Sequence, residues 1–170
     1  GGTVECACGD ILVESQVMWY DLVECATAWG LQIGENDITL DGDGHTLDGD
    51  THFNMIKMTG KSGVTIKYCI IQDAQWGIFM DFYCSNITIS SNQFYNSEKA
   101  IVLNRVCTNN IISNNLIDNN LRGIRFDWLS NNNTCFGNTI INNNYGIYHY
   151  NSQANTFYDN VFINNTNYNA

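Results

Sequence analysis

The chain of 170 residues contains no proline, although average usage of about 5% would predict about eight. Proline removes a backbone donor and is excluded from interior strands, so its absence favours continuous hydrogen-bonded ladders. No apolar run approaches the roughly 18 residues of a membrane-spanning helix, which excludes such a span. Basic residues are also scarce: seven Lys and Arg against 17 Asp and Glu give a net charge of −10, which argues against nucleic acid as a partner.

Seven cysteines in a chain of this size are typical of proteins from an oxidising compartment. The start, Gly1-Gly2-Thr3, lacks the basic and apolar regions of a signal peptide. We therefore expect the mature form of a secreted protein, located extracellularly or at the cell surface.

The sequence repeats every 23 residues, as three columns of apolar anchors show. Around each anchor the pattern alternates with the period of a strand that has one buried face. The first column holds Ile78, Ile101, Ile124 and Ile147, the second holds Ile66, Ile89, Ile112 and Cys135, and the third holds Ile71, Phe94, Ile117, Ile140 and, after a coil one residue shorter, Phe162.

Three short strands per repeat cannot bury their own inward faces, but coils stacked about 4.8 Å apart form three parallel sheets around one core. The repeat therefore predicts an all-β fold, a right-handed parallel β-helix of about six to seven coils of 22–23 residues. We expect a single domain over residues 1–170, with an irregular N-terminal coil or cap at 1–36, regular coils at 37–163 and a tail at 164–170.

Asparagine is concentrated in the second half of the chain, where 24 of the 26 lie in residues 86–170. Asn92, Asn115, Asn138 and Asn160 each precede a third-column anchor by two residues, and Cys69 takes that place in an earlier coil. Asparagine tolerates the left-handed conformation of tight turns, and stacked amides can hydrogen-bond from coil to coil. The pattern predicts an asparagine ladder.

The N-terminal segments resemble those of secreted right-handed β-helix repeat proteins of bacteria and archaea, the carbohydrate-binding and sugar-hydrolase β-helices. That group includes surface proteins, polysaccharide lyases and hydrolases, and a periplasmic factor for copper-enzyme maturation. The resemblance implies the fold, export and a Cys8–Cys25 disulfide, and it is weak for activity because the matching residues serve turns, core and disulfide. These residues are Cys8-Gly9-Asp10, 21–25, 30–33, 38–41 and 44–47.

Cys84 and Cys107 are 23 residues apart and so lie one coil apart, about 4.8 Å, within the range that a disulfide accepts. We predict a bridge between them. Cys135 occupies an isoleucine column, which indicates a buried thiol. Cys6 has no evident partner, so it is a candidate for pairing between subunits. The Cys6-Ala7-Cys8 segment lacks the second pair of ligands that a zinc or copper site would need.

An acidic segment holds four carboxylates that are weak candidates for calcium binding, Asp41, Asp43, Asp48 and Asp50. Their spacing is not that of an EF-hand, and Asp and Gly also serve ordinary turns. We expect no cofactor, with calcium as the alternative. His45 and His52 make a transition-metal site conceivable, although a role of His45 in its turn is favoured.

Alternation aims a set of polar and aromatic side chains outward on one strand of successive coils. If the protein were an enzyme, Asp81 and Asp127 would be the acidic pair, about 9.6 Å apart, with Arg125 beside them. His149 falls in the inward column and is more consistent with a core position than with a general base. The candidate carbohydrate-binding residues are Phe79, Asp81, Asn104, Arg125, Asp127, Trp128, Tyr148 and Tyr150.

Three N-glycosylation sequons begin at Asn86, Asn132 and Asn164, about the number expected by chance. For function we favour an extracellular structural protein, a surface or assembly subunit stacking head-to-tail into filaments, because no catalytic set is recognisable. The alternative is a carbohydrate-binding module or small polysaccharide lyase or hydrolase. A periplasmic metal-delivery protein is a third possibility, implied by the resemblance alone.

Overall fold

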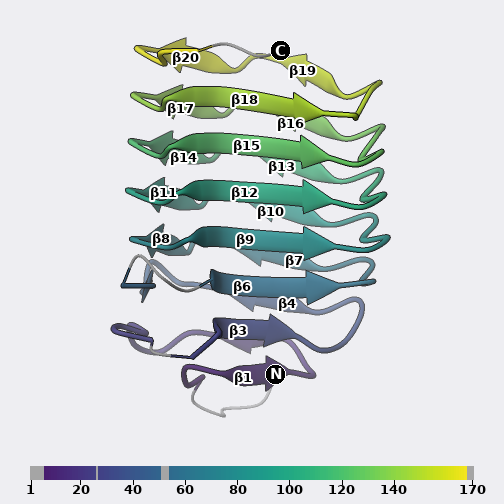
Figure 1. Ribbon diagram of the computed structural model, residues 1–170. Helices are drawn as coiled ribbons and strands as arrows, with labels where there is room; N and C mark the ends of the chain where they lie inside the picture. Colours follow the sequence, from purple (N-terminus) through teal and green to yellow (C-terminus); the bar gives the residue numbers. More distant parts are fainter. Residues whose placement is uncertain (1–5, 26, 51–53, 168–170) are drawn as a thin grey trace.

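The computed structural model describes residues 6–25, 27–50 and 54–167, and Figure 1 shows them stacked as successive coils of a parallel β-helix. Every regular element is a strand, and the strands form three parallel sheets of seven, seven and six members. This confirms the predicted fold class. No helix in the described parts of the chain is long and apolar enough to cross a membrane.

The first sheet faces the viewer in Figure 1 and contains the longest strands. Consecutive members belong to consecutive coils, so the sheet runs along the whole stack. In spatial order they are β1 (Asp10–Leu12), β3 (Trp29–Ile33), β6 (Asn54–Thr59), β9 (Trp76–Asp81), β12 (Lys99–Asn104), β15 (Arg122–Asp127) and β18 (Tyr145–Tyr150).

The other two sheets are built from short strands and close the coil. The second consists of β2 (Gln16–Val17), β4 (Thr39–Asp41), β7 (Thr65–Lys67), β10 (Thr88–Ser90), β13 (Ile111–Ser113), β16 (Thr134–Phe136) and β19 (Thr156–Tyr158). The third consists of β5 (Thr46–Asp48), β8 (Ile70–Gln72), β11 (Gln93–Tyr95), β14 (Leu116–Asp118), β17 (Thr139–Ile141) and β20 (Val161–Ile163).

The three predicted anchor columns are the three inner walls of the helix. Ile78 pairs with Ile101, which pairs with Ile124, and the two short-strand columns follow the same register. These side chains are almost entirely buried and belong to one continuous apolar cluster, except for Phe162, which is partly buried and packs against it. A shift of one residue would turn every anchor outward, so burial of the anchors fixes the register.

Asparagine lines three ladders, one of which the sequence pattern predicts. In each, the side-chain oxygen accepts a hydrogen bond from the main-chain N–H one coil earlier, and its amide donates to a main-chain carbonyl. The predicted ladder runs Asn92, Asn115, Asn138, Asn160 and begins at the N–H of Cys69; the others run Asn110, Asn133, Asn155 and Ser97, Asn120, Asn143, Asn165.

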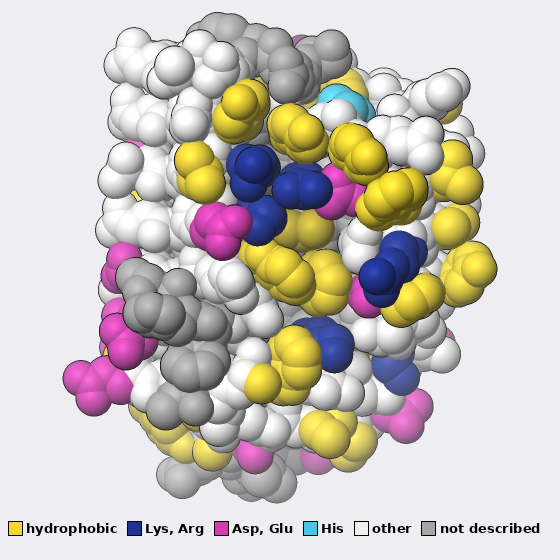
Figure 2. All heavy atoms as spheres, viewed as in Figure 1, with side chains coloured by type: hydrophobic (Ala, Val, Ile, Leu, Met, Phe, Trp, Pro, Cys, Tyr) yellow, Lys and Arg dark blue, Asp and Glu magenta, His cyan; other side chains and the backbone are white. Residues whose placement is uncertain are grey.

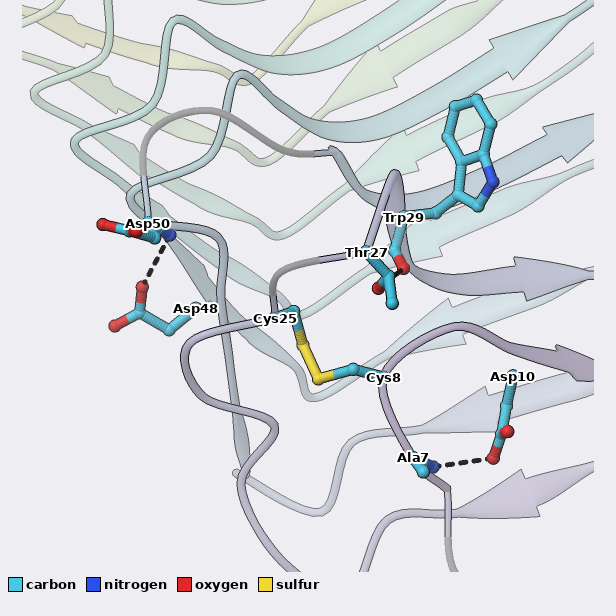
Figure 3. The surroundings of a disulfide bond; sticks show 8 residues. All are labelled: Ala7, Cys8, Asp10, Cys25, Thr27, Trp29, Asp48 and Asp50. Atoms are coloured by element: carbon cyan, nitrogen blue, oxygen red, sulfur yellow. Dashed lines mark hydrogen bonds between the residues drawn. A yellow bond between two sulfur atoms is a disulfide. The ribbon is translucent and has the colours of Figure 1, made fainter.

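The N-terminal part of the chain already belongs to the sheets. β1 pairs with β3, and β3 pairs with β6, so strands begin within the segment for which an irregular coil or cap is predicted. Cys8 and Cys25 form a disulfide beside this first coil, as the family resemblance implies (Figure 3). The bridge joins the segment before β1 to the loop before β3.

Candidate functional sites

The first candidate site is a pair of buried thiols. Cys84 follows β9 and Cys107 follows β12, each after a turn of two residues with positive φ. The isolated bridge between Ser85 and Thr108 places the two cysteines in register on adjacent coils. Both are fully buried and free, so the predicted disulfide between them is absent.

Both thiols have the same local geometry. The Cys84 thiol donates to the carbonyl of Asp81 at 3.3 Å, and the Cys107 thiol donates to the carbonyl of Asn104 at 3.0 Å. One coil later the Ser130 hydroxyl makes the equivalent bond to Asp127. Each turn therefore requires a small side chain that can donate a hydrogen bond, and either serine or cysteine meets that need. Two sulfurs lie near each other only because two consecutive coils both have cysteine at this position.

The two thiols differ in acidity because each side chain influences the other. The pKa of Cys84 is lowered, first by the neighbouring Cys107 side chain, while burial acts in the opposite sense. The pKa of Cys107 is raised, first by the Cys84 side chain and then by burial. Cys84 is therefore the member of the pair that loses its proton first.

The other free cysteines stand apart from this pair. Burial raises the pKa of Cys69 to about 12 and also raises that of Cys135, which packs in its isoleucine column as a core residue. Cys6 is buried too, and its pKa is raised by burial and then by Asp10. Pairing of Cys6 between subunits stays a prediction.

The acidic segment does not assemble a metal site. Asp41 forms an ion pair with Lys67 at 2.9 Å and accepts a hydrogen bond from the N–H of Asp43. Asp48 accepts hydrogen bonds from Gln72 and from the N–H of Asp50. Within the described residues no group of three or more His, Cys, Asp or Glu side chains is placed to hold a metal ion.

The histidines are also separate. His45 contacts Asp21 at 3.1 Å, and the pKa of Asp21 is lowered first by the N–H of Thr46 and then by this histidine. His149 stacks on Phe126 at a centroid distance of 5.0 Å, in the inward column that the sequence predicts for it. His52 lies outside the described residues.

The second candidate site is the outer face of β9, β12, β15 and β18. We call it the cation–aromatic face, and Figure 2 shows basic side chains gathered there among hydrophobic ones. Arg122 lies 5.8 Å and 5.5 Å from the ring centroids of Tyr145 and Tyr148, and Lys99 lies 5.2 Å from that of Trp76. Its members are Trp76, Phe79, Lys99, Arg122, Arg125, Tyr145 and Tyr148.

The carboxylates predicted to point freely into solvent on this face are instead covered. Asp81 is 7% exposed and accepts hydrogen bonds from Asn104 and Arg105, while Asp127 is 5% exposed and is paired with Arg125. Phe79 is also buried, beneath Trp76 at 4.4 Å. Outward side chains on adjacent coils are close enough to cover one another. The alternation of inward and outward residues along a strand does not predict this mutual burial.

The remaining predicted binding residues lie at one edge of this face. Trp128 and Tyr150 are exposed and meet edge to face at 5.1 Å. Trp128 also lines a shallow surface hollow of about 320 Å³, which includes the turns directly before Cys84 and Cys107. Its other lining residues are Phe82, Tyr83, Arg105, Val106, Leu129 and Asn151.

The three sequon asparagines, Asn86, Asn132 and Asn164, are exposed and have positive φ. They therefore occupy turn corners, whereas the ladder asparagines are inside. Their glycosylation stays a prediction.

Fold and sites together define a parallel β-helix repeat protein with a buried thiol pair and a cationic, aromatic outer face. The chain belongs to the family described as periplasmic copper-binding protein (NosD), whose model matches residues 18–170. The periplasmic description agrees with the coarse prediction of a location outside the cytoplasm. No curated protein and no solved structure matches the chain.

The family corrects one prediction directly. We expected no cofactor, with calcium as the alternative, whereas the family is described as copper-binding. The sequence analysis considers metal sites at carboxylates, at histidines and at the Cys6-Ala7-Cys8 segment, whereas it predicts a disulfide between Cys84 and Cys107. The spacing of Cys84 and Cys107, one repeat apart, was the feature of the sequence that could have indicated a pair of sulfur ligands for a soft metal ion.

The donor atoms present allow only one kind of copper site among the described residues. Cu(II) favours several nitrogen and oxygen ligands, and no such cluster is assembled. Cu(I) favours thiolate and thioether sulfur, and two thiolates suffice to hold it. The adjacent thiols of Cys84 and Cys107 fit this second requirement.

Proposed function

We propose that this protein binds copper outside the cytoplasm as Cu(I), with the sulfur atoms of Cys84 and Cys107 as its ligands. The family description supports copper as the metal. The observation that carries the proposal is the pair of buried, free thiols held in register on adjacent coils.

The coil geometry prepares the ligands before metal arrives. Each sulfur is oriented by a hydrogen bond to the carbonyl three residues earlier, so neither cysteine has to find its rotamer on binding. Parallel coils fix the two residues about 4.8 Å apart. Bound Cu(I) would accept electron density from both thiolates, and binding would release the thiol protons.

The surroundings suit a soft, weakly hydrated ion. Both sulfurs lie in the apolar core cluster, which also contains Met58 and Met80. The turn directly before Cys84 carries Phe82 and Tyr83, which are exposed, so we expect the metal to enter through this turn rather than through the sheets. Apolar surroundings also slow oxidation of the thiols by excluding water.

The test is a Cu(I) titration of the reduced protein under anaerobic conditions, in competition with a chromogenic Cu(I) chelator. Wild type should withdraw one copper per chain from the chelator, and X-ray absorption should show a first shell of sulfur. Cys84→Ser and Cys107→Ser should each lose this binding. Cys135→Ser is the matched control, because it also removes a buried thiol but has no neighbouring sulfur, and it should bind as wild type does.

Retention of copper in the Cys84→Ser/Cys107→Ser double variant would contradict the proposed ligands. Absence of binding in fully reduced wild type would contradict copper binding itself. Thiol counting by mass spectrometry before the titration shows whether the cysteines are reduced, because a Cys84–Cys107 disulfide would lower the mass by two hydrogen atoms.

Head-to-tail stacking into filaments remains a prediction about the same protein. It rests on the exposed edges of any β-helix coil, and sedimentation over a wide concentration range tests it. A monomer at all concentrations would contradict it.

A further inference from the structure

The turns that follow the long strands of three successive coils carry large apolar side chains on the surface. Figure 2 shows hydrophobic side chains gathered at the right edge of the molecule, where these turns lie in Figure 1. Tyr83 and Leu129 are the most exposed of them, at 68% and 53%. A contiguous exposed apolar patch of this kind marks an interaction site. We call it the apolar turn stripe, and its members are Phe82, Tyr83, Arg105, Val106, Trp128 and Leu129.

The backbone of the apolar turn stripe is unfavourable for the side chains that it carries. All six members have a positive φ, between 46° and 68°. Glycine and asparagine adopt this conformation most easily, and Gly60 and Asn151 take the places of Phe82 and Trp128 in the coils on either side. An aromatic or β-branched residue at positive φ costs conformational free energy. The turn geometry therefore does not account for these residues, whereas a use for their apolar surface does.

The charges around the stripe favour a partner that carries phosphate. Arg105 is its only charged member, and its guanidinium lies 4.5 Å from the ring centroid of Phe82 and 3.3 Å from the carboxylate of Asp81, which is itself buried. Residues 86–170 contain four Lys and Arg and four Asp and Glu, so the net charge of −10 resides entirely in residues 1–85. The half of the chain that holds most of the stripe therefore does not repel phosphate groups.

The stripe is too small for a stable protein partner. Its half-exposed rings and its leucine offer on the order of 500 Å² of surface, whereas a stable interface buries about 800 Å² on each partner. A lipid bilayer needs no matching protein surface, because single Trp, Tyr, Phe and Leu side chains enter its headgroup region. Trp and Tyr suit that region because each combines an apolar ring with a polar hydrogen-bonding group.

We infer that the apolar turn stripe docks the protein on the surface of a phospholipid membrane. The side chains of Tyr83, Trp128 and Leu129 enter the headgroup region, and Arg105 binds a lipid phosphate. The stripe crosses three adjacent coils, so the stack lies flat on the bilayer instead of standing on one end. Docking by this stripe does not require bound copper.

The experiment is co-sedimentation of the intact protein with large unilamellar vesicles of phosphatidylcholine and phosphatidylglycerol, with tryptophan fluorescence as a second readout. We expect wild type to sediment with the vesicles and its emission to shift to shorter wavelength, a shift that Trp128→Phe should remove. Tyr83→Asn/Leu129→Asn should weaken vesicle binding about tenfold to a hundredfold. Because asparagine tolerates positive φ, this variant should unfold at the same temperature as wild type or at a higher one.

Tyr68→Asn is the matched control, because Tyr68 is also exposed and has a positive φ but follows β7, away from the long strands. It should bind vesicles as wild type does, while Arg105→Gln should weaken binding less than the apolar double variant does. Failure of wild type to sediment with the vesicles, or an equal loss of binding in Tyr68→Asn, would overturn the inference. A stable dimer in sedimentation equilibrium that Tyr83→Asn/Leu129→Asn dissociates would also overturn it, because the stripe would then bind a second copy of the chain.

Discussion

His149 occupies an inward position where the preceding coil has Phe126. The two rings stack at 5.0 Å, and Phe157 meets His149 edge to face at 5.4 Å. Burial among these rings lowers the pKa of the imidazole, because an apolar environment disfavours the charged form. A single polar residue thus ends an otherwise apolar column.

This lowered pKa makes stability depend on pH. Below the ordinary histidine pKa of about 6.5 the unfolded chain binds more protons than the folded one. The stability that the neutral His149 contributes is therefore fully present above pH 6.5. It is lost as the pH falls from 6.5 towards the lower pKa of His149 in the folded state. His149→Phe should reduce the difference in free energy of unfolding between pH 7.5 and pH 5, measured by urea denaturation. An unchanged difference would contradict the prediction.

At the scale of the element, the asparagine ladders join the turns of successive coils. The Asn115 side chain is 2% exposed; its oxygen accepts from the main-chain N–H of Asn92, and its amide donates to the carbonyl of Ile89. It also donates to the side-chain oxygen of Asn138. The ladder therefore satisfies main-chain groups that the short strands leave unpaired at their ends.

Asn115→Ala should lower the free energy of unfolding by about 3 kcal/mol, because it strands a buried donor and a buried acceptor. Asn144→Ala is the control, since Asn144 is exposed at a turn corner, and it should change stability by less than about 0.5 kcal/mol. Thermal or urea unfolding of both variants checks this. Equal losses in the free energy of unfolding for the two variants would show that a ladder asparagine contributes no more to stability than an exposed one.

Elements also show where sequence reasoning succeeded and where it stopped. The anchors of β9, β12 and β15 repeat at 23 residues, and stacking leaves them one register, so their pairing was predictable. Asn110 precedes the second-column anchor Ile112 by two residues, and Asn120 recurs at the same period, so the signal was present, but their ladders were not predicted. Cys84 and Cys107 were correctly placed one above the other, whereas their oxidation state depends on sulfur orientation that periodicity does not specify.

For the whole molecule, stability is distributed along the stack because each coil contacts mainly its neighbours. The Cys8–Cys25 disulfide closes a loop with a sequence separation of 17 at one end of that stack. Figure 3 shows it near residues of the first coils such as Asp10, Trp29 and Asp48. Its effect is expected to be local.

Cys8→Ser/Cys25→Ser should destabilise the N-terminal coils by about 3 kcal/mol. Hydrogen exchange should then show faster opening of β3 and β6 with little change in β15 and β18. Cys135→Ala, a cavity-forming change in β16, should show the opposite distribution. A uniform loss of protection in both variants would contradict this local behaviour and indicate one cooperative unit.

The sequence by itself determined the coil. Its 23-residue period, the alternation around each anchor and the absence of proline leave one way to bury the apolar columns, namely to stack them. Tertiary structure decided everything that depends on how neighbouring side chains meet. The outward carboxylates became covered, Cys84 and Cys107 became a thiol pair, and Arg122 came to lie beside Tyr145 and Tyr148. Periodicity fixes which residues are neighbours, whereas rotamers, burial and local charge fix what those neighbours do.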